Sequence, residues 1–338
     1  MKVAIVGCGN VSALHFDAAF RSPAAQLAAA VDIKPERANR YAEKYGIKAY
    51  TDYYEMLDNE KPDVVHICTP HYLHTKYAVE ALSRGINVLS EKPCSVSDEE
   101  VKVLREAQKN SSAQYAVCFQ NRYNSCVKEL IKIRDSGELG KIKAIRAFVT
   151  WFRDAGYYSD DWHGTREKEC GCLLINQAIH TVDLIGYIGG DCKALTAHIS
   201  NDSLEGIIEC EDTASMRMEL ENGVTAVFYG TLAYGSNAPV LIEVVFEKGI
   251  LRTEGEKLFR IEEDGGINEI PLKSKEAGGK DYWGSGHPSL ISDFYDSIAT
   301  GRKFKTDAQS GGKAAKVVFA AYRSSALGAR VEIDNTEE

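Results

Sequence analysis

The stretch that decides the fold is "KVAIVGCGNVS", residues 2–12. A continuous apolar run that ends in glycines is typical of a strand buried on both faces of a parallel sheet, and helical spacing of apolar residues begins directly after it. In such a strand-to-helix turn, Gly7 permits the tight bend and Gly9 lets the backbone approach a pyrophosphate, which the helix N-terminus attracts. The pattern predicts a dinucleotide-binding loop whose contacts are made by Gly7, Gly9, Asn10 and Val11.

An acidic residue supports the same interpretation. Asp32 ends the second apolar run, "QLAAAVD", at close to the spacing of roughly 20 residues expected for the carboxylate that binds a ribose 2′-hydroxyl. A carboxylate repels a 2′-phosphate, so NAD is favoured over NADP, although Lys34 is near enough in sequence to offset part of that repulsion. The alternative is a plain glycine turn with an exposed aspartate at a strand end.

Strands and helices alternate through the first third of the chain. Strands are predicted at 2–9, 26–32, 63–70, 86–93 and 114–120, and helices at 11–22, 35–46, 71–85, 97–110 and 122–137. This alternation predicts an α/β fold with an N-terminal Rossmann-type, doubly wound parallel sheet that carries helices on both faces.

After about Gly140 the pattern changes to a run of strands, several of them alternating with period two, which predicts an antiparallel or mixed sheet. Predicted strands lie at 141–152, 212–221, 223–235, 239–249, 250–261 and 329–333, with helices at 175–183, 287–301 and 308–328. We expect two domains, a dinucleotide-binding domain at 1–122 and an α+β domain at 123–338 for substrate and oligomerisation. The alternative for the last helix is that it packs back on the first domain.

Composition narrows the class of protein. The net charge of −9 over 338 residues argues against nucleic-acid binding, which favours basic surfaces. The nine cysteines are scattered along the chain, which favours reduced thiols. Cys170 and Cys172 form a close pair, but no second close pair completes a metal site, so no metal is expected. No apolar run is long enough to span a membrane, and the chain starts directly on a strand without a signal peptide. A cytoplasmic protein with no membrane partner is expected.

A lysine stands at the end of the fourth predicted strand. In "EKP", residues 91–93, Pro93 excludes a helical conformation for Lys92 and stiffens the turn. Ligands bind at this carboxyl edge in doubly wound sheets, so Lys92 is either a side chain beside the nicotinamide or a solvated turn lysine.

The segment "INQAIHTVD", residues 175–183, combines an apolar stripe with two polar side chains. Its apolar residues recur at helical spacing, which predicts a half-buried helix. Asn176 and His180 are four residues apart, so both lie on one face of such a helix. They are either satisfied core polar groups or the working face of an active site.

Four motifs together resemble one family along essentially the whole chain. The stretches "GCGNVS", "ICTPHYLH", "LSEKP" and "CGCLLINQAIHTVD" are similar in order and spacing to the glucose–fructose oxidoreductase, inositol dehydrogenase and rhizopine-catabolism (Gfo/Idh/MocA) family. The resemblance implies a C-terminal α+β domain with an open, mainly antiparallel sheet that forms a homodimer or homotetramer. It also implies NAD(P)-dependent oxidation or reduction of a sugar or cyclitol carbon.

The resemblance also implies roles for particular residues. Lys92 and His180 would be the catalytic pair, with a cis bond before Pro93. Thr69, Pro70 and His71 would wrap the nicotinamide ribose, and Glu91 and Lys92 would also contact the cofactor. Asn176 stands where inositol dehydrogenases carry aspartate, and an amide cannot act as a base, so the chain looks more like the sugar-nucleotide and glycoside 3-dehydrogenase branches.

The segment before this helix, residues 151–172, looks like the substrate loop of bacterial relatives. It departs from their usual pattern at His163, Arg166, Cys170 and Cys172. The expected substrate-binding residues are Lys92, Arg122, Tyr158, Trp162, Asn176 and His180.

The expected function is hydride transfer between NAD and a secondary alcohol or ketone of a sugar, at C3 of a pyranoside or sugar nucleotide. Histidine accepts protons near neutral pH, and Lys92 would orient the hydroxyl or stabilise an alkoxide. Two alternatives remain: an inositol-type cyclitol dehydrogenase, and a non-catalytic NAD-binding regulatory protein.

Overall fold

The computed structural model describes residues 1–272 and 285–335. The chain divides into two compact units, which are each described by themselves. The first unit contains Met1–Gln120 and His287–Gly312, and the second contains Asn121–Gly286 and Lys313–Glu338.

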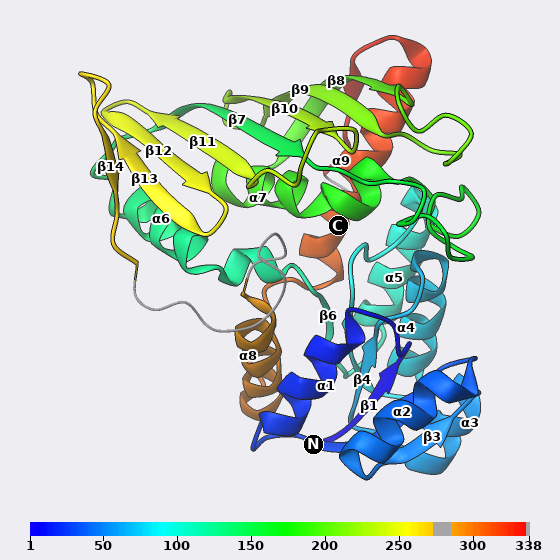
Figure 1. Ribbon diagram of the computed structural model, residues 1–338. Coiled ribbons are helices and arrows are strands. Elements are labelled where there is room, and N and C mark those ends of the chain that lie inside the picture. The colour runs from blue at the N-terminus through cyan, green and yellow to red at the C-terminus, as the bar shows by residue number, and fades with distance from the viewer. Residues whose placement is uncertain (273–284, 336–338) are drawn as a thin grey trace. The chain divides into compact units, whose positions relative to one another are not determined.

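The first unit is built on a parallel sheet of six strands in the order β3-β2-β1-β4-β5-β6 (Figure 1). The strands are β1 Lys2–Val6, β2 Gln26–Val31, β3 Lys48–Tyr50, β4 Val64–Ile67, β5 Asn87–Ser90 and β6 Tyr115–Val117. The helices are α1 Ser12–Arg21, α2 Pro35–Tyr45, α3 Tyr53–Glu60, η1 His71–Leu73, α4 His74–Ser83, α5 Asp98–Lys109 and α8 His287–Thr300. All four residues of β4 are buried, as a strand covered on both faces requires.

Local signals fixed several helix ends in this unit. Pro35 occupies the first turn of α2 and Gly46 ends it in the left-handed conformation, with φ of 67°. The Ser97 side chain accepts a hydrogen bond from the Glu100 amide and caps α5. The sequence analysis missed β3 and α3, although Asp52 caps α3 by the same kind of contact.

The second unit contains a sheet of nine strands in the order β14-β13-β12-β11-β7-β10-β9-β8-β15. Among its paired strands only β10 and β7 run parallel, so the sheet is mainly antiparallel, as expected. The strands are β7 Ile142–Thr150, β8 Cys192–Ser200, β9 Thr213–Leu220, β10 Thr225–Thr231, β11 Leu241–Phe246, β12 Gly249–Glu254, β13 Lys257–Ile261, β14 Ile267–Glu269 and β15 Val331–Glu332.

Helices cover one face of this sheet. The helices are α6 Ser125–Ser136, the π turn η3 Leu173–Gln177, α7 Ile179–Gly189 and most of α9 Ala308–Leu327. Helix α7 packs against β7, and α6 packs against β12 and β13 (Figure 1). Along β9 the residues Ala214, Met216, Met218 and Leu220 are all buried, which confirms the predicted alternation.

The structure corrects three predictions. Residues 287–312 belong to the first unit, where α8 packs on α1, although the whole of 123–338 was expected in the second. The predicted strand 250–261 is two strands, β12 and β13, because a turn at Gly255, with φ of 59°, reverses the chain. The predicted helix 175–183 is a π turn followed by an α-helix, and strand β8 was not anticipated.

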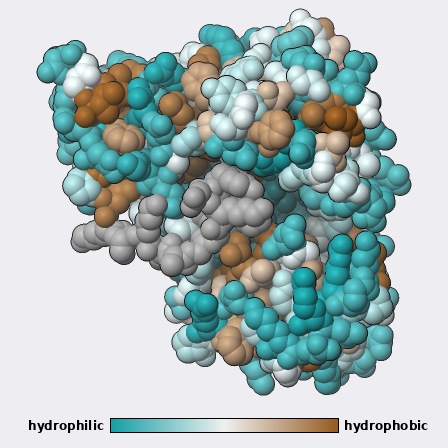
Figure 2. Space-filling model, in the orientation of Figure 1, coloured by the Kyte–Doolittle hydropathy of each residue, from teal (hydrophilic) through white to brown (hydrophobic). Residues whose placement is uncertain are grey.

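The face of the molecule seen in Figure 2 has few large apolar areas. Figure 2 shows a mainly hydrophilic face on which apolar side chains form small scattered patches. Within the described residues no helix combines the length and the apolar character needed to cross a bilayer.

Candidate active site

The glycine loop between β1 and α1 forms the first part of the site. Gly7 has φ of 87°, and a Cβ there would lie 2.5 Å from the Cys68 carbonyl oxygen, so only glycine fits this turn. A Cβ on Gly9 would meet no described atom within 4 Å, which leaves the backbone open to a ligand. The buried Ser12 hydroxyl donates to the Gly9 carbonyl at 2.7 Å and so stabilises the loop from its buried side.

Asp32 lies at the end of β2 beside the loop. Its carboxylate accepts hydrogen bonds from the Cys8 amide at 2.8 Å and the Lys34 amide at 2.9 Å. Because each carboxylate oxygen has two lone pairs, these bonds fix the group while leaving it able to accept from a ribose hydroxyl. Arg40 donates to the Cys8 carbonyl, so a cation also stands next to this loop.

The carboxyl edge of β4 and β5 carries the second set of expected residues. His71 is buried and begins η1 directly after Thr69 and Pro70. His74 lies between two backbone carbonyls, with Nδ1 2.7 Å from that of Pro93 and Nε2 2.8 Å from that of Thr69. It therefore ties the loop after β4 to the loop after β5.

Glu91 and Lys92 follow β5 at this edge. The bond between Lys92 and Pro93 is cis, as the family resemblance implied. Glu91 is buried, and its Oε2 accepts from the Lys92 amide at 3.3 Å. The glycine loop, Asp32 and these residues all belong to the first unit, and the open backbone at Gly9 fits a bound dinucleotide.

In the second unit, Asn176 and His180 lie at the junction of η3 and α7. The Ala178 amide donates to the Leu173 carbonyl, five residues back, at 2.7 Å, which is π-helical geometry. Asn176 is therefore in a wider turn than His180, and the two do not have the straight-helix relationship predicted from their spacing. His180 is half-buried, whereas residues 171–179 are buried.

The amide of Asn176 is held by a residue that the sequence analysis missed. Its Nδ2 donates to Oε1 of the buried Glu169 at 2.5 Å, and the other Glu169 oxygen accepts from the Gly164 amide. Burial raises the pKa of Glu169 to about 7, against the effect of these hydrogen bonds. No local pattern in "TREKECGC" distinguishes this glutamate from its exposed neighbours.

The substrate-loop aromatics form a second network in this unit. Gln177 accepts from Arg153 at 2.9 Å and donates to the Tyr157 hydroxyl at 2.7 Å. Tyr158 is buried, and its hydroxyl makes no hydrogen bond to the residues that the structure describes. The Trp162 and His163 rings are in contact in a tilted arrangement, with centroids 3.7 Å apart and an angle of 35° between their planes.

Arg122 is placed in an ion pair with Asp183. Its guanidinium donates to both carboxylate oxygens, at 2.5 and 2.8 Å, and lies over the Tyr187 ring. Burial raises the pKa of Asp183, although the guanidinium favours the charged carboxylate. An anionic substrate group would have to compete with Asp183 for this cation.

The remaining unusual loop residues have structural contacts. The His163 ring lies 2.6 Å from Asp160, and Arg166 donates to the Glu209 carbonyl at 2.7 Å. The nine cysteines, all of them described, form no disulfide. Cys170 and Cys172 belong to no metal-binding group within 1–272 and 285–335.

The parallel sheet, the open glycine loop and the acidic residue after β2 define a dinucleotide-binding domain. The chain matches the oxidoreductase family with an NAD-binding Rossmann fold over residues 1–119, and the GFO/IDH/MocA C-terminal domain over residues 127–252. It therefore belongs to the GFO/IDH/MocA family and is an NAD-dependent oxidoreductase of the sugar dehydrogenase type. The expected family, α/β fold and NAD cofactor are confirmed.

The chain is similar to dehydrogenases that are named for different compounds. D-glucoside 3-dehydrogenase of Escherichia coli (strain K12) is 25% identical over 98% of this chain and 97% of that protein. Inositol 2-dehydrogenase of Corynebacterium glutamicum (strain R) is 25% identical over 75% of this chain and 73% of that protein. The WlbA dehydrogenase from Bordetella pertussis, crystallised with NADH and UDP-GlcNAcA, is 27% identical with a TM-score of 0.86, and 99% of each chain is covered.

Proposed function

We propose that the protein transfers a hydride between NAD and a secondary alcohol or ketone at C3 of a pyranoside or sugar nucleotide. The observation that carries the proposal is the Asn176 amide, which is buried and hydrogen-bonded to Glu169. The motif resemblance implies that inositol dehydrogenases carry aspartate at this position. An amide can hydrogen-bond a sugar hydroxyl but cannot remove a proton. Similarity to the glucoside 3-dehydrogenase and to a dehydrogenase that binds UDP-GlcNAcA supports the same choice.

The proton chemistry is assigned to two side chains. NAD supplies the hydride acceptor when bound. We assign His180 as the base that takes the hydroxyl proton, because its motif resembles that of the family's catalytic histidine and an imidazole accepts protons near neutral pH. Lys92 orients the same hydroxyl and stabilises negative charge on its oxygen. Placing both in one reaction rests on the resemblance of their motifs.

The cofactor contacts are assigned to the first unit. Gly7, Gly9, Asn10 and Val11 would hold the pyrophosphate, and Asp32 the adenosine ribose. Thr69, Pro70, His71, Glu91 and Lys92 would line the nicotinamide end.

Among the substrate contacts, the buried Tyr158 hydroxyl has an unused donor and acceptor toward the described residues, which suits a sugar hydroxyl. Trp162 would stack on the ring, and Arg122 would bind an anionic group only in exchange for Asp183.

A substrate screen tests the proposal directly. Glycosides, sugar nucleotides, free sugars and inositols are each supplied with NAD, and NADH formation is followed. We expect turnover of a pyranoside or sugar nucleotide. Turnover of inositols alone would favour the cyclitol dehydrogenase, and NADH binding without turnover of any of these compounds would favour the non-catalytic alternative.

Three variants test the site. Lys92→Met and His180→Ala should lose turnover by roughly a hundredfold or more while still binding NADH, since each removes a proton-handling group. Wild-type turnover in both would refute the catalytic assignment.

Asn176→Asp should reduce turnover of the pyranoside, because it places a second carboxylate beside Glu169. If that variant instead keeps wild-type turnover, the amide is not the specificity determinant.

We also propose that the nine-stranded sheet mediates homodimer or homotetramer formation. Phe148 of β7 and Tyr229 of β10 are paired neighbours, and Val227 lies on the same face of β10, two residues away. All three are exposed by 37% or more, which is unusual for adjacent large apolar side chains. Tyr229→Glu should lower the mass measured by light scattering; an unchanged mass would refute this interface.

The free cysteines favour a reducing compartment, and we place the protein in the cytoplasm.

A further inference from the structure

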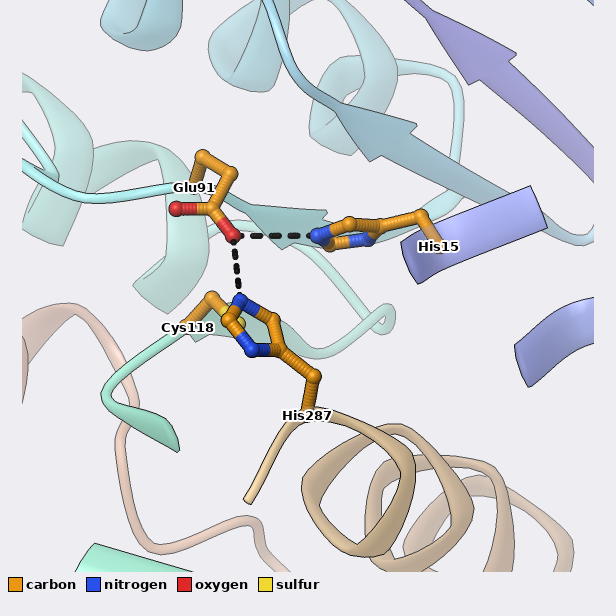
Figure 3. Close-up of side chains that lie close together, drawn as sticks. All are labelled: His15, Glu91, Cys118 and His287. Atoms are coloured by element: carbon orange, nitrogen blue, oxygen red, sulfur yellow. Dashed lines mark hydrogen bonds and ion pairs between the residues drawn. The ribbon is translucent and has the colours of Figure 1, made fainter. Parts of the chain in front are cut away.

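Four buried side chains that can all bind a metal ion meet at one point of the first unit (Figure 3). His15 comes from α1, Glu91 follows β5, Cys118 follows β6, and His287 is the first residue of α8. Each is at most 4% exposed, and the four ligand atoms all lie within 4.8 Å of one another. The sequence could not show this group, because its members are far apart along the chain.

The spacing of the ligand atoms suits a tetrahedral ion. Glu91 Oε1 lies 3.0 Å from His15 Nε2 and 3.4 Å from His287 Nε2, as the dashed lines in Figure 3 mark. A tetrahedral ion with bonds of about 2.0–2.3 Å holds its ligand atoms about 3.3–3.8 Å apart. The group therefore needs only small side-chain shifts to surround an ion.

His287 gives a second and independent indication of a ligand. Its ring is buried, and neither nitrogen makes a hydrogen bond to any part of the chain that the structure describes. Its Nε2 faces the Glu91 oxygen without hydrogen-bond geometry. Buried imidazoles nearly always have a hydrogen-bond partner, so a ring whose two nitrogens have none is available to a ligand.

The residues behind His15 can set its ring for metal binding. His15 Nδ1 lies 3.0 Å from His66 Nδ1, and His66 Nε2 lies 3.0 Å from the Tyr295 hydroxyl. His15 Nε2 hydrogen-bonds the Glu91 carboxylate, so metal binding requires the other tautomer, in which His15 donates from Nδ1 to His66 and its Nε2 lone pair faces the centre of the group. His66 then donates to the Tyr295 oxygen, which can accept. Such outer hydrogen bonds are what orients metal-binding histidines.

We propose that His15, Glu91, Cys118 and His287 bind one divalent first-row transition-metal ion, with Zn²⁺ as the best match to two imidazoles, a thiolate and a carboxylate. Binding forms a metal–sulfur bond and releases the Cys118 proton to solvent. The ion, the thiolate and the carboxylate then sum to zero charge, which suits a fully buried position. All four ligands come from the protein, so the site is structural and joins α8 to the edge of the sheet that carries Lys92.

Cobalt binding to the full chain tests the proposal. Protein freed of metal with a chelator is titrated with Co²⁺, whose visible absorption reports tetrahedral geometry and whose near-ultraviolet charge-transfer band reports a thiolate ligand. We expect one Co²⁺ per chain with both signals, displaced by Zn²⁺, and a higher Tm with Zn²⁺ than without it. Absence of a one-to-one tetrahedral complex in folded wild-type protein would overturn the proposal.

Matched variants locate the ion. Cys118→Ser should abolish the charge-transfer band and weaken Co²⁺ binding by about tenfold or more. Cys94→Ser changes a buried thiol of the same unit outside the group, and Cys170→Ser a more accessible one in the second unit; both should behave as wild type. Loss of the band in either control but not in Cys118→Ser would refute the assignment. If Cys118→Ser does not fold, His287→Gln is measured in its place. This variant should bind Co²⁺ more weakly and keep the charge-transfer band. Unchanged Co²⁺ binding in His287→Gln would refute the site.

Discussion

Replacing Glu169 with glutamine should change how the stability of the second unit depends on pH. Glu169 is buried, its pKa is about 7, and the ordinary value is 4.5. Glu169 therefore binds its proton more tightly in the folded protein than in the unfolded chain. Its contribution to the free energy of unfolding is fully present below pH 4.5. That contribution is lost as the pH rises through 7.

The size of the effect follows from the shift. At 1.36 kcal/mol per pKa unit, the difference between 4.5 and about 7 corresponds to about 3 kcal/mol of unfolding free energy lost between pH 4.5 and pH 8. In Glu169→Gln the group no longer titrates, so this loss disappears. Glutamine has one donor and one acceptor at its end, like the neutral acid, and Asn176 can turn its amide to match it.

Urea unfolding at several pH values measures this difference. Tryptophan fluorescence reports on the second unit through Trp151 and Trp162. The stability of Glu169→Gln relative to wild type should rise by about 3 kcal/mol from pH 4.5 to pH 8. Glu167→Gln, an exposed neighbour, should show no such trend. A difference between Glu169→Gln and wild type that stays constant with pH would refute the raised pKa and the buried, proton-sharing role of this glutamate.

Three further outcomes are expected. Gly7→Ala should abolish NADH binding measured by fluorescence, because its Cβ would overlap the backbone at the end of β4; normal binding would contradict the observed turn. Asp32→Ala should raise the NADP/NAD ratio of kcat/KM by about tenfold or more, since Arg40 remains beside the loop, and an unchanged ratio would remove the cofactor argument. Arg122→Ala should lower the free energy of unfolding, measured with urea, by about 3–5 kcal/mol, because Asp183 is left buried without its partner. Replacing both residues with leucine should lower it by less. Equal losses in the two variants would show that Arg122 and Asp183 are not energetically coupled.

Most of the elements that sequence patterns missed or merged are short, although the nine-residue strand β8 was missed as well. A three-residue strand such as β3 offers no periodicity to detect, and α3 is only eight residues long, although its Asp52 cap was visible in the sequence. The β12–β13 hairpin looked like one strand because its turn at Gly255 interrupts the alternation only briefly. Hydrophobic spacing detected the helical character of residues 175–183, but only backbone hydrogen bonds show that the segment begins as a π turn.

By itself the sequence determined the features that depend on neighbours in the chain. The order of strands and helices, the glycine turn, the caps of α2 and α5 and the acid after β2 all follow from local spacing. Each depends on backbone conformation or periodicity within a few residues, which is why local motifs were sufficient to predict the family and the cofactor.

Only the tertiary structure decided which distant polar side chains share a buried space. Glu169 reaches Asn176 across a loop, Arg122 pairs with Asp183, and the group around Glu91 draws on residues as far apart as 15 and 287. Such contacts form when sheet edges and helix ends converge, because a buried charge must find a partner wherever the fold brings one. Nothing in the local spacing of these residues records that convergence.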